Sequence, residues 1–109
     1  MELIKGTLDV LILKTLSWEA LHGYGISKAI RIRTREVFTV EEGALYPALR
    51  RLEKKELVEA AWARTDTGRE AKFYTLTDAG RTHLEHEVSD WGRYVEAMSR
   101  VLHATDGAP

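Results

Sequence analysis

One stretch decides the fold, and it reads GALYPALRRL at residues 43–52. Leu45, Leu49 and Leu52 are spaced at i, i+4 and i+7, which places them on one face of a helix. Pro47 has no backbone N–H, so it belongs within or just after the first helical turn. We therefore predict a helix that begins at Glu42 to Ala44, ends near Lys55 and buries its leucines.

The face opposite the leucines combines small side chains with groups that bind phosphate. It carries Ala44, Pro47, Ala48 and Arg51, with Tyr46 and Arg50 on its flanks. Small residues let the backbone approach base edges, while arginine and tyrosine side chains reach phosphates or a guanine edge. The positive end of the helix also favours a phosphate. The alternative is an ordinary amphipathic helix with a solvated basic face.

Downstream of this helix, two extended segments predict a β-hairpin. Residues 57–64 and 69–76 include Trp62, Phe73 and Tyr74, which favour strands. The segment TDTG between them ends in a glycine and predicts a turn. Basic residues, Arg69 and Lys72 among them, lie near this turn. A basic hairpin beside a DNA-reading helix can follow the phosphate backbone or enter the minor groove.

Upstream, two shorter helices are expected. Apolar residues at intervals of three and four predict the first at Leu8–Trp18, with Thr7 as its N-cap. The second is expected at Tyr24–Thr34, after a segment with two glycines. Lys28, a basic residue of this second helix, is also predicted to contact DNA.

The last predicted helix begins after Thr77, its expected N-cap, and ends near His103. Apolar residues recur along it at alternating intervals of four and three, a heptad pattern that suits a partner helix. This seam comprises Leu84, Val88, Trp91, Val95, Met98 and Leu102. We predict a dimerisation helix, against the alternative of packing on the first helix.

Two features of the last helix leave alternatives open. Trp91 lies in the middle of the seam, where an aromatic side chain can close a dimer interface or line a pocket for an aromatic ligand. His83 and His86 lie at i and i+3 beside Glu87, a weak pattern for a metal site. We interpret the histidines as surface residues and expect neither a metal nor a cofactor.

Composition and charge narrow the class of protein. The chain has 109 residues and no cysteine, which fits one domain without disulfides. Its net charge is −1, yet residues 28–72 carry eleven basic and eight acidic side chains, against three basic and six acidic in residues 73–109. A basic middle beside an acidic end is typical of two separate roles. No catalytic triad or phosphate-binding glycine loop appears, so we do not expect an enzyme.

No run is long and apolar enough for a membrane span, and no signal peptide is recognisable, so we expect a cytoplasmic protein. The predicted fold class is mainly α with a small β-hairpin. It is a winged helix-turn-helix followed by a C-terminal dimerisation helix. We expect a DNA-binding domain over residues 1–76, the dimerisation helix over 77–103 and a disordered tail over 104–109.

Four motifs, in order, resemble signatures of the PadR family of bacterial transcriptional regulators. They are GTLDVLIL (6–13), LHGYGI (21–26), GALYPALRRLE (43–53) and GREAKFYTLTDAG (68–80). The resemblance covers about residues 6–103 and points to the subgroup with a single short C-terminal helix.

The resemblance implies a homodimeric repressor that binds double-stranded DNA through Tyr24, Tyr46 and a wing carrying Arg69 and Lys72. Some members release DNA on binding aromatic compounds, and Trp91 falls at a position similar to a ligand-lining tryptophan of multidrug-binding relatives. Where the family often has a hydroxyl residue, this chain has Ala44. An adaptor that binds protein instead of DNA is the competing hypothesis.

Overall fold

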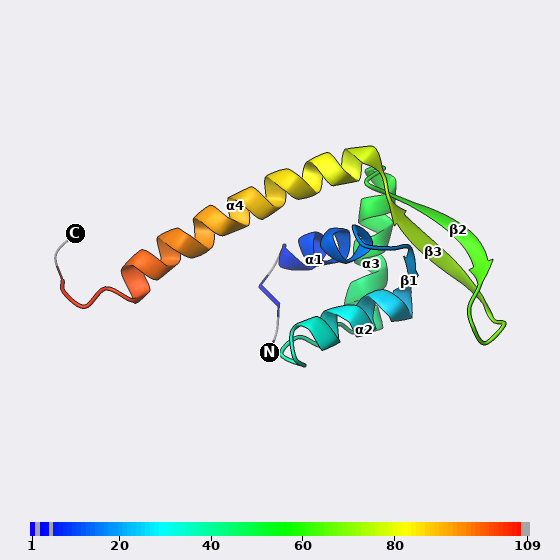
Figure 1. The fold of residues 1–109 in the computed structure, drawn as a ribbon, viewed down its shortest axis with the longest axis horizontal. Coiled ribbons are helices and arrows are strands. Elements are labelled where there is room, and N and C mark those ends of the chain that lie inside the picture. Colours follow the sequence, from blue (N-terminus) through cyan, green and yellow to red (C-terminus); the bar gives the residue numbers. More distant parts are fainter. Residues whose placement is uncertain (2, 5, 108–109) are drawn as a thin grey trace.

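The computed structural model describes residues 1, 3–4 and 6–107 (Figure 1). The elements, in chain order, are α1 (Thr7–Leu16), β1 (Leu21–His22), α2 (Gly23–Arg33), α3 (Glu42–Lys54), β2 (Val58–Arg64), β3 (Glu70–Leu76) and α4 (Asp78–Leu102). The three short helices pack together, the β2–β3 hairpin projects from them, and α4 extends away on the other side (Figure 1). The predicted winged helix-turn-helix with a long last helix is confirmed.

The sheet has three strands where the sequence predicted two. β1 pairs antiparallel with β3, with Leu21 opposite Tyr74 and His22 opposite Phe73, so the strand order is β1-β3-β2. A two-residue strand is too short to show alternating hydrophobicity, which is why the pattern missed it. Its pairing attaches the hairpin to the start of α2.

The hairpin forms as predicted. β2 and β3 pair from Val58 opposite Leu76 to Arg64 opposite Glu70. Gly68 has a φ of 83°, a left-handed conformation that closes the turn without a Cβ clash. We call Val58–Leu76 the wing.

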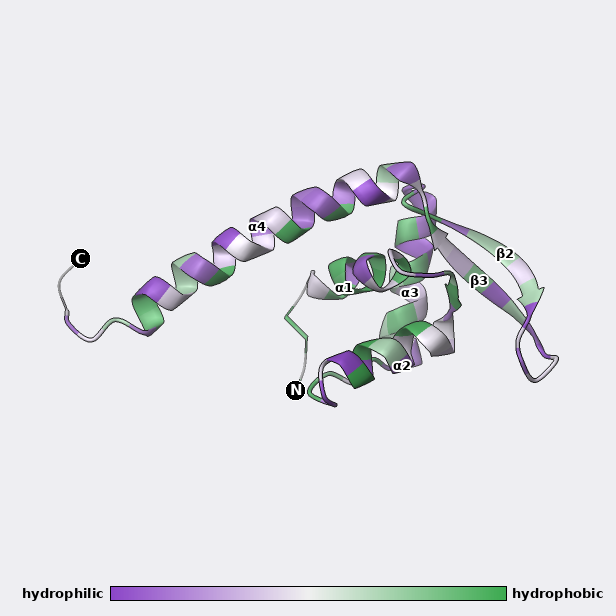
Figure 2. Ribbon diagram, in the orientation of Figure 1, coloured by the Kyte–Doolittle hydropathy of each residue, from purple (hydrophilic) through white to green (hydrophobic). Residues whose placement is uncertain are grey.

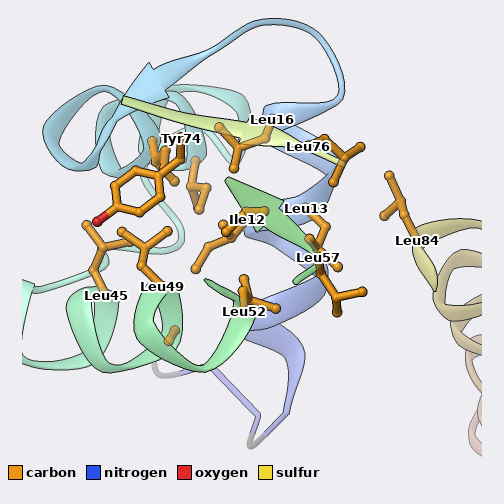
Figure 3. Close-up of a cluster of buried hydrophobic side chains, with 14 of the residues drawn as sticks. Ile12, Leu13, Leu16, Leu45, Leu49, Leu52, Leu57, Tyr74, Leu76 and Leu84 are labelled. Carbon is orange, nitrogen blue, oxygen red and sulfur yellow. The ribbon is translucent and has the colours of Figure 1, made fainter. Parts of the chain in front are cut away.

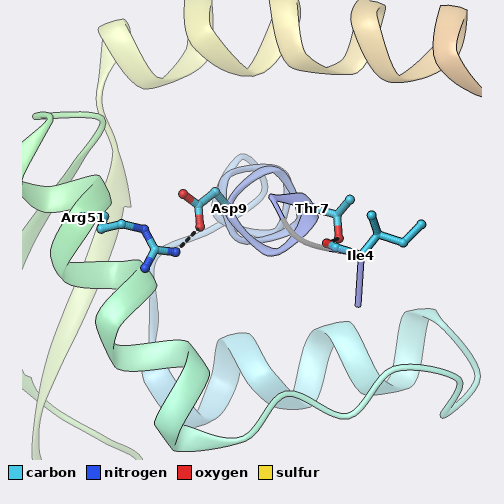
Figure 4. A network of polar contacts seen from close by, with 4 residues as sticks. All are labelled: Ile4, Thr7, Asp9 and Arg51. Carbon is cyan, nitrogen blue, oxygen red and sulfur yellow. Dashed lines mark hydrogen bonds and ion pairs between the residues drawn. The ribbon is translucent and has the colours of Figure 1, made fainter. Parts of the chain in front are cut away.

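One of the two predicted N-caps is wrong. Thr77 caps α4 as expected, because its hydroxyl accepts a hydrogen bond from the Gly80 N–H at 2.9 Å. At α1 the N-cap is Gly6, with a φ of 89°, and Thr7 is the first helical residue. The Thr7 hydroxyl donates to the Ile4 carbonyl at 2.6 Å, so it is turned away from the capping position (Figure 4). α1 also ends at Leu16, before the predicted Trp18.

The core lies where α1, α2 and α3 meet the base of the wing (Figure 3). The predicted leucines of α3 are buried, together with residues of α1 and α2 such as Ile12 and Ile26. Ala48 is also fully buried, so its predicted place on the outer face of α3 is wrong. A helix that packs against two neighbours buries a stripe wider than its leucines, and a methyl group at Ala48 fits the space between helices.

α4 makes the molecule elongated. The overall dimensions are 60 × 29 × 22 Å, and the radius of gyration is 16.3 Å. A compact chain of this length would have a radius of about 13 Å. The start of the helix is attached firmly, because Gly80 is buried against the Leu57 carbonyl and Leu84 belongs to the core. The rest of α4 extends past α1 as an arm (Figure 1).

Residues 104–107 follow α4 without helix or strand. The last two residues of the predicted tail, 108 and 109, lie outside the described residues. The tail's disorder therefore stays a prediction.

Candidate nucleic-acid interface

A cleft separates the wing from the outer faces of α2 and α3. Its volume is about 930 Å³, within the range of small-molecule sites, and its lining combines aromatic rings with cationic side chains. It is lined by His22, Gly23, Tyr24, Lys28, Tyr46, Arg50, Trp62, residues 65–67, residues 69–72 and Tyr74. These residues come from five elements (β1, α2, α3, β2 and β3) and the turn of the wing, so the cleft exists only in the folded chain.

Four cationic side chains and two acidic ones line this cleft. The cations come from three places: Lys28 from α2, Arg50 from α3, and Arg69 and Lys72 from the wing. The Lys72 ammonium lies 3.3 Å from a carboxylate oxygen of Glu53, which neutralises part of its charge. Within the described ranges, the other three cations form no ion pair. They are therefore available to bind phosphates.

Tyr46 is held in the cleft by its contact with α2. A Cβ at Gly23 would lie 2.6 Å from the Tyr46 hydroxyl oxygen, so only glycine allows this close approach. The Tyr46 side chain stays partly exposed. Tyr24, which follows Gly23 in α2, is also exposed. Both phenols can therefore reach a polyanion in the cleft.

His22 organises the corner where β1 becomes α2. Its Nδ1 accepts a hydrogen bond from the Gly25 N–H at 3.0 Å and caps the helix. The ring also packs edge-on against Phe73, with centroids 5.1 Å apart. His22 therefore connects the start of α2 to the wing, although it was not among the predicted site residues.

Tyr74 lies beneath the cleft and links the wing to α3. Its ring is buried in the core beside Leu45 and Leu49 (Figure 3). Burial raises the pKa of the Tyr74 hydroxyl above its ordinary value, against the opposing effect of nearby Lys72. The phenol therefore stays neutral under physiological conditions and remains a hydrogen-bond donor.

The cleft brings together six of the nine residues in the predicted DNA-binding set. They are Tyr24, Lys28, Tyr46, Arg50, Arg69 and Lys72. The other three, Ala44, Pro47 and Arg51, lie on α3 but do not line the cleft. Ala44 is exposed near the start of the helix, and Pro47 is half-buried.

Arg51 has a structural partner. Its guanidinium donates to the Asp9 carboxylate at 2.9 Å, which joins α3 to α1 (Figure 4). Position 51 is one residue after Arg50 and therefore faces about 100° away from it around the helix. The sequence placed Arg51 on the outer face of the helix and Arg50 on its flank, and both were expected to reach DNA. The ion pair of Arg51 was not predicted, because the position of α1 cannot be derived from the pattern of α3.

Trp62 also lines the cleft, although it was not among the predicted site residues. Alternation along β2 could have placed it there, because residues 58, 60 and 62 share one face of the strand. Val58 is buried and Ala60 packs against the core, so this is the inner face of the wing.

The predicted seam lies on α4, where a single chain leaves most of it uncovered. Leu84 belongs to the core. The other five seam residues are between 41% and 68% exposed: Val88, Trp91, Val95, Met98 and Leu102. Figure 2 shows hydrophobic residues recurring along α4 as far as its end. This apolar face is available to a second chain.

Trp91 stacks on Tyr94, with ring centroids 5.7 Å apart. Both rings border a shallow groove of about 350 Å³ between the start of α1 and the arm, which Val10 also lines. Trp91 thus lies at the predicted place on the last helix, next to another aromatic ring.

The histidine pair of α4 shows no metal-binding geometry. His83 Nε2 lies 3.4 Å from a Glu87 carboxylate oxygen. Among the residues that the structure describes, no three His, Cys, Asp or Glu side chains are grouped to hold a metal ion. In the described part of the chain, no helix has both the length and the apolar character that a membrane span requires.

Three packed helices, a cationic cleft and a hairpin beside the third helix define a winged helix-turn-helix protein. The chain belongs to the PadR-like family of transcriptional regulators, whose profile matches residues 12–86. The family predicted from the four motifs is therefore confirmed. Its members regulate transcription and bind DNA.

Solved structures agree with this assignment, and the chain is also similar to an uncharacterized protein. A PadR-like transcriptional regulator from Bacillus cereus is 31% identical with a TM-score of 0.80, over 92% of this chain and 95% of that one. A transcriptional regulator from Clostridium thermocellum is 31% identical with a TM-score of 0.77, over 92% and 93% of the two chains. An uncharacterized protein of Lysinibacillus sphaericus is 36% identical over 97 residues, 89% of each chain.

A longer protein contains a similar segment. An uncharacterized 37.1 kDa protein in a transposon of Streptomyces fradiae is 39% identical over 85 residues. Those residues are 78% of this chain and 23% of that protein.

Proposed function

We propose that this protein is a homodimeric repressor that binds a pseudo-palindromic operator in double-stranded DNA. The cleft between α3 and the wing carries the proposal. A helix that enters the major groove and a hairpin that reaches the next minor groove have one sugar–phosphate strand between them. Cations and phenols from α2, α3 and the wing line the space where that strand would lie.

The exposed seam of α4 supports the dimer. Two copies joined through this face would present two α3 helices, and the arm would set their separation. Half-sites one helical turn apart would then match the symmetry of the protein.

Binding to the promoter region of the protein's own operon tests this function. We expect fluorescence anisotropy to give nanomolar to micromolar affinity, with a logarithm that falls linearly with the logarithm of salt concentration. Unrelated DNA of the same length should bind more weakly at every salt concentration. Equal affinity for both DNAs would contradict specific regulation, and no binding at low salt would favour the protein-binding adaptor.

Three arginine variants locate the interface. Arg50→Ala should weaken binding and reduce the salt slope by about 1, because one phosphate contact is lost. Arg93→Ala removes the same charge from α4 outside the seam and should leave the slope unchanged. We expect an intermediate effect for Arg51→Ala, because its ion pair with Asp9 competes with DNA. A slope unchanged by Arg50→Ala would exclude Arg50 as a phosphate contact.

A small aromatic effector is a further part of the proposal. The exposed Trp91–Tyr94 pair and its groove can take a planar ring. Titration with planar aromatic compounds should quench tryptophan fluorescence and release promoter DNA. Trp91→Ala should lose both responses, whereas Trp18→Ala should keep them. Release that persists in Trp91→Ala would exclude this site.

A further inference from the structure

The three tryptophans of the chain have different surroundings. Trp18 is covered by the Arg33 guanidinium, whose carbon lies 3.9 Å from the ring centroid. Trp91 stacks on Tyr94. Trp62 is 70% exposed, the most of the three. Within residues 1, 3–4 and 6–107, no aromatic ring and no cation stacks on it.

The strand register turns Trp62 toward the cleft. It lies opposite Lys72, and the next pair on the same face is Ala60 opposite Tyr74. Tyr74 is buried beneath α3. The inner face of the wing therefore continues from the core into the cleft, where Trp62 is its largest side chain.

The surroundings of Trp62 define what can cover it. Arg69 and Lys72 on the wing and Arg50 on α3 line the same cleft, and together with Lys28 they outnumber its two acidic side chains, so the cleft favours an occupant with negative charge. The indole itself presents a wide apolar face. A sugar–phosphate strand combines the two properties, because anionic phosphates alternate with apolar faces of deoxyribose.

We propose that Trp62 contacts DNA, its indole packing against a deoxyribose of the backbone strand held between α3 and the wing. The cations neutralise the phosphates that flank this deoxyribose. The indole sets the position of the wing along the DNA backbone strand. Trp62 thus adds an uncharged, shape-dependent contact to a largely electrostatic site. This inference rests on the proposed function.

Its position within the wing supports this role. Trp62 lies three residues before Thr65, where the turn of the wing begins. The turn extends beyond it and would reach the neighbouring groove, so the backbone strand between the grooves falls beside Trp62.

The test compares Trp62→Ala, Trp62→Phe and Trp18→Ala with the wild-type chain on the same promoter duplex. We expect Trp62→Ala to weaken binding about tenfold, toward the low end of the loss measured for aromatic side chains that stack on bases, because a deoxyribose offers a smaller contact face than a base. The salt slope should stay unchanged, because an apolar contact releases no counterions. Trp62→Phe should recover most of the affinity, and Trp18→Ala should bind like the wild type.

Fluorescence gives a second readout on the same samples. Excited selectively as tryptophan, the wild-type chain should be quenched by saturating DNA, and Trp62→Phe should lose that change. Trp62 is too exposed to support the fold, so the thermal midpoint of Trp62→Ala should match the wild type.

Wild-type affinity in Trp62→Ala, or a reduced salt slope, would overturn this inference and leave the proposed function intact. A wild-type chain that binds no DNA would overturn both.

Discussion

α3 and α4 carry similar apolar stripes with opposite fates. Leu45, Leu49 and Leu52 of α3 are at most 2% exposed, because α1, α2 and the wing cover them. On α4 the stripe is covered only at Leu84, and the next five members remain largely in contact with water. Helical periodicity therefore predicts that a face needs burial, but not whether the same chain or another provides it.

The substitution with the largest expected effect is in the buried stripe of α3. Leu49→Ala should lower the free energy of unfolding by about 2–5 kcal/mol, because it leaves a cavity in a filled core. Leu102→Ala removes the same atoms from the exposed end of the seam and should lower it far less. Urea denaturation of both variants at one protein concentration measures the difference. Equal losses would mean that a second copy covers Leu102 as completely as the core covers Leu49.

The second prediction tests what covers α4. Val95→Glu should weaken the proposed dimer at least about 100-fold, or about 2.8 kcal/mol, because each copy would bury an unpaired carboxylate in the seam. Light scattering at micromolar concentration should then report a monomer. Ser89→Glu adds the same charge outside the seam and should leave a dimer. A dimer that survives Val95→Glu would place the contact elsewhere.

The third prediction concerns the junction of the two regions. A Cβ at Gly80 would clash with the Leu57 carbonyl oxygen, a backbone atom that cannot move freely. Gly80→Ala should therefore destabilise the chain by about 1–3 kcal/mol and shift the start of α4. The thermal midpoint should fall by several degrees. An unchanged midpoint would contradict the tight packing at this junction.

The sequence predicted much of the fold because most of its elements have strong local signals. The leucine spacing of α3, the glycine turn of the wing and the Thr77 cap are local features. The strand β1, the burial of Ala48 and the Asp9–Arg51 ion pair all depend on segments far apart in the chain. Local patterns carry no information about such contacts.

The candidate site divides in the same way. Residue type identified the cations and phenols of the cleft, whereas its shape depends on the pairing of β1 with β3. That pairing brings His22 and Gly23 next to the wing. Alternation along β2 could have predicted the face of the strand on which Trp62 lies. Its exposure depends on the relative positions of α3 and the wing, which the sequence pattern does not give.

The substitution with the smallest expected effect is at Gly92, in the exposed part of α4. A Cβ at Gly92 would meet no atom within 4 Å in the single chain, so the position is open where Gly80 is closed. Gly92→Ala should raise the free energy of unfolding by about 0.5–1 kcal/mol, because glycine inside a helix loses more backbone entropy on folding than alanine. Urea denaturation measures the gain, and light scattering checks that the dimer persists. A loss of stability would mean that Gly92 is not open in the dimer. The second copy would then pack directly on the backbone beside Trp91.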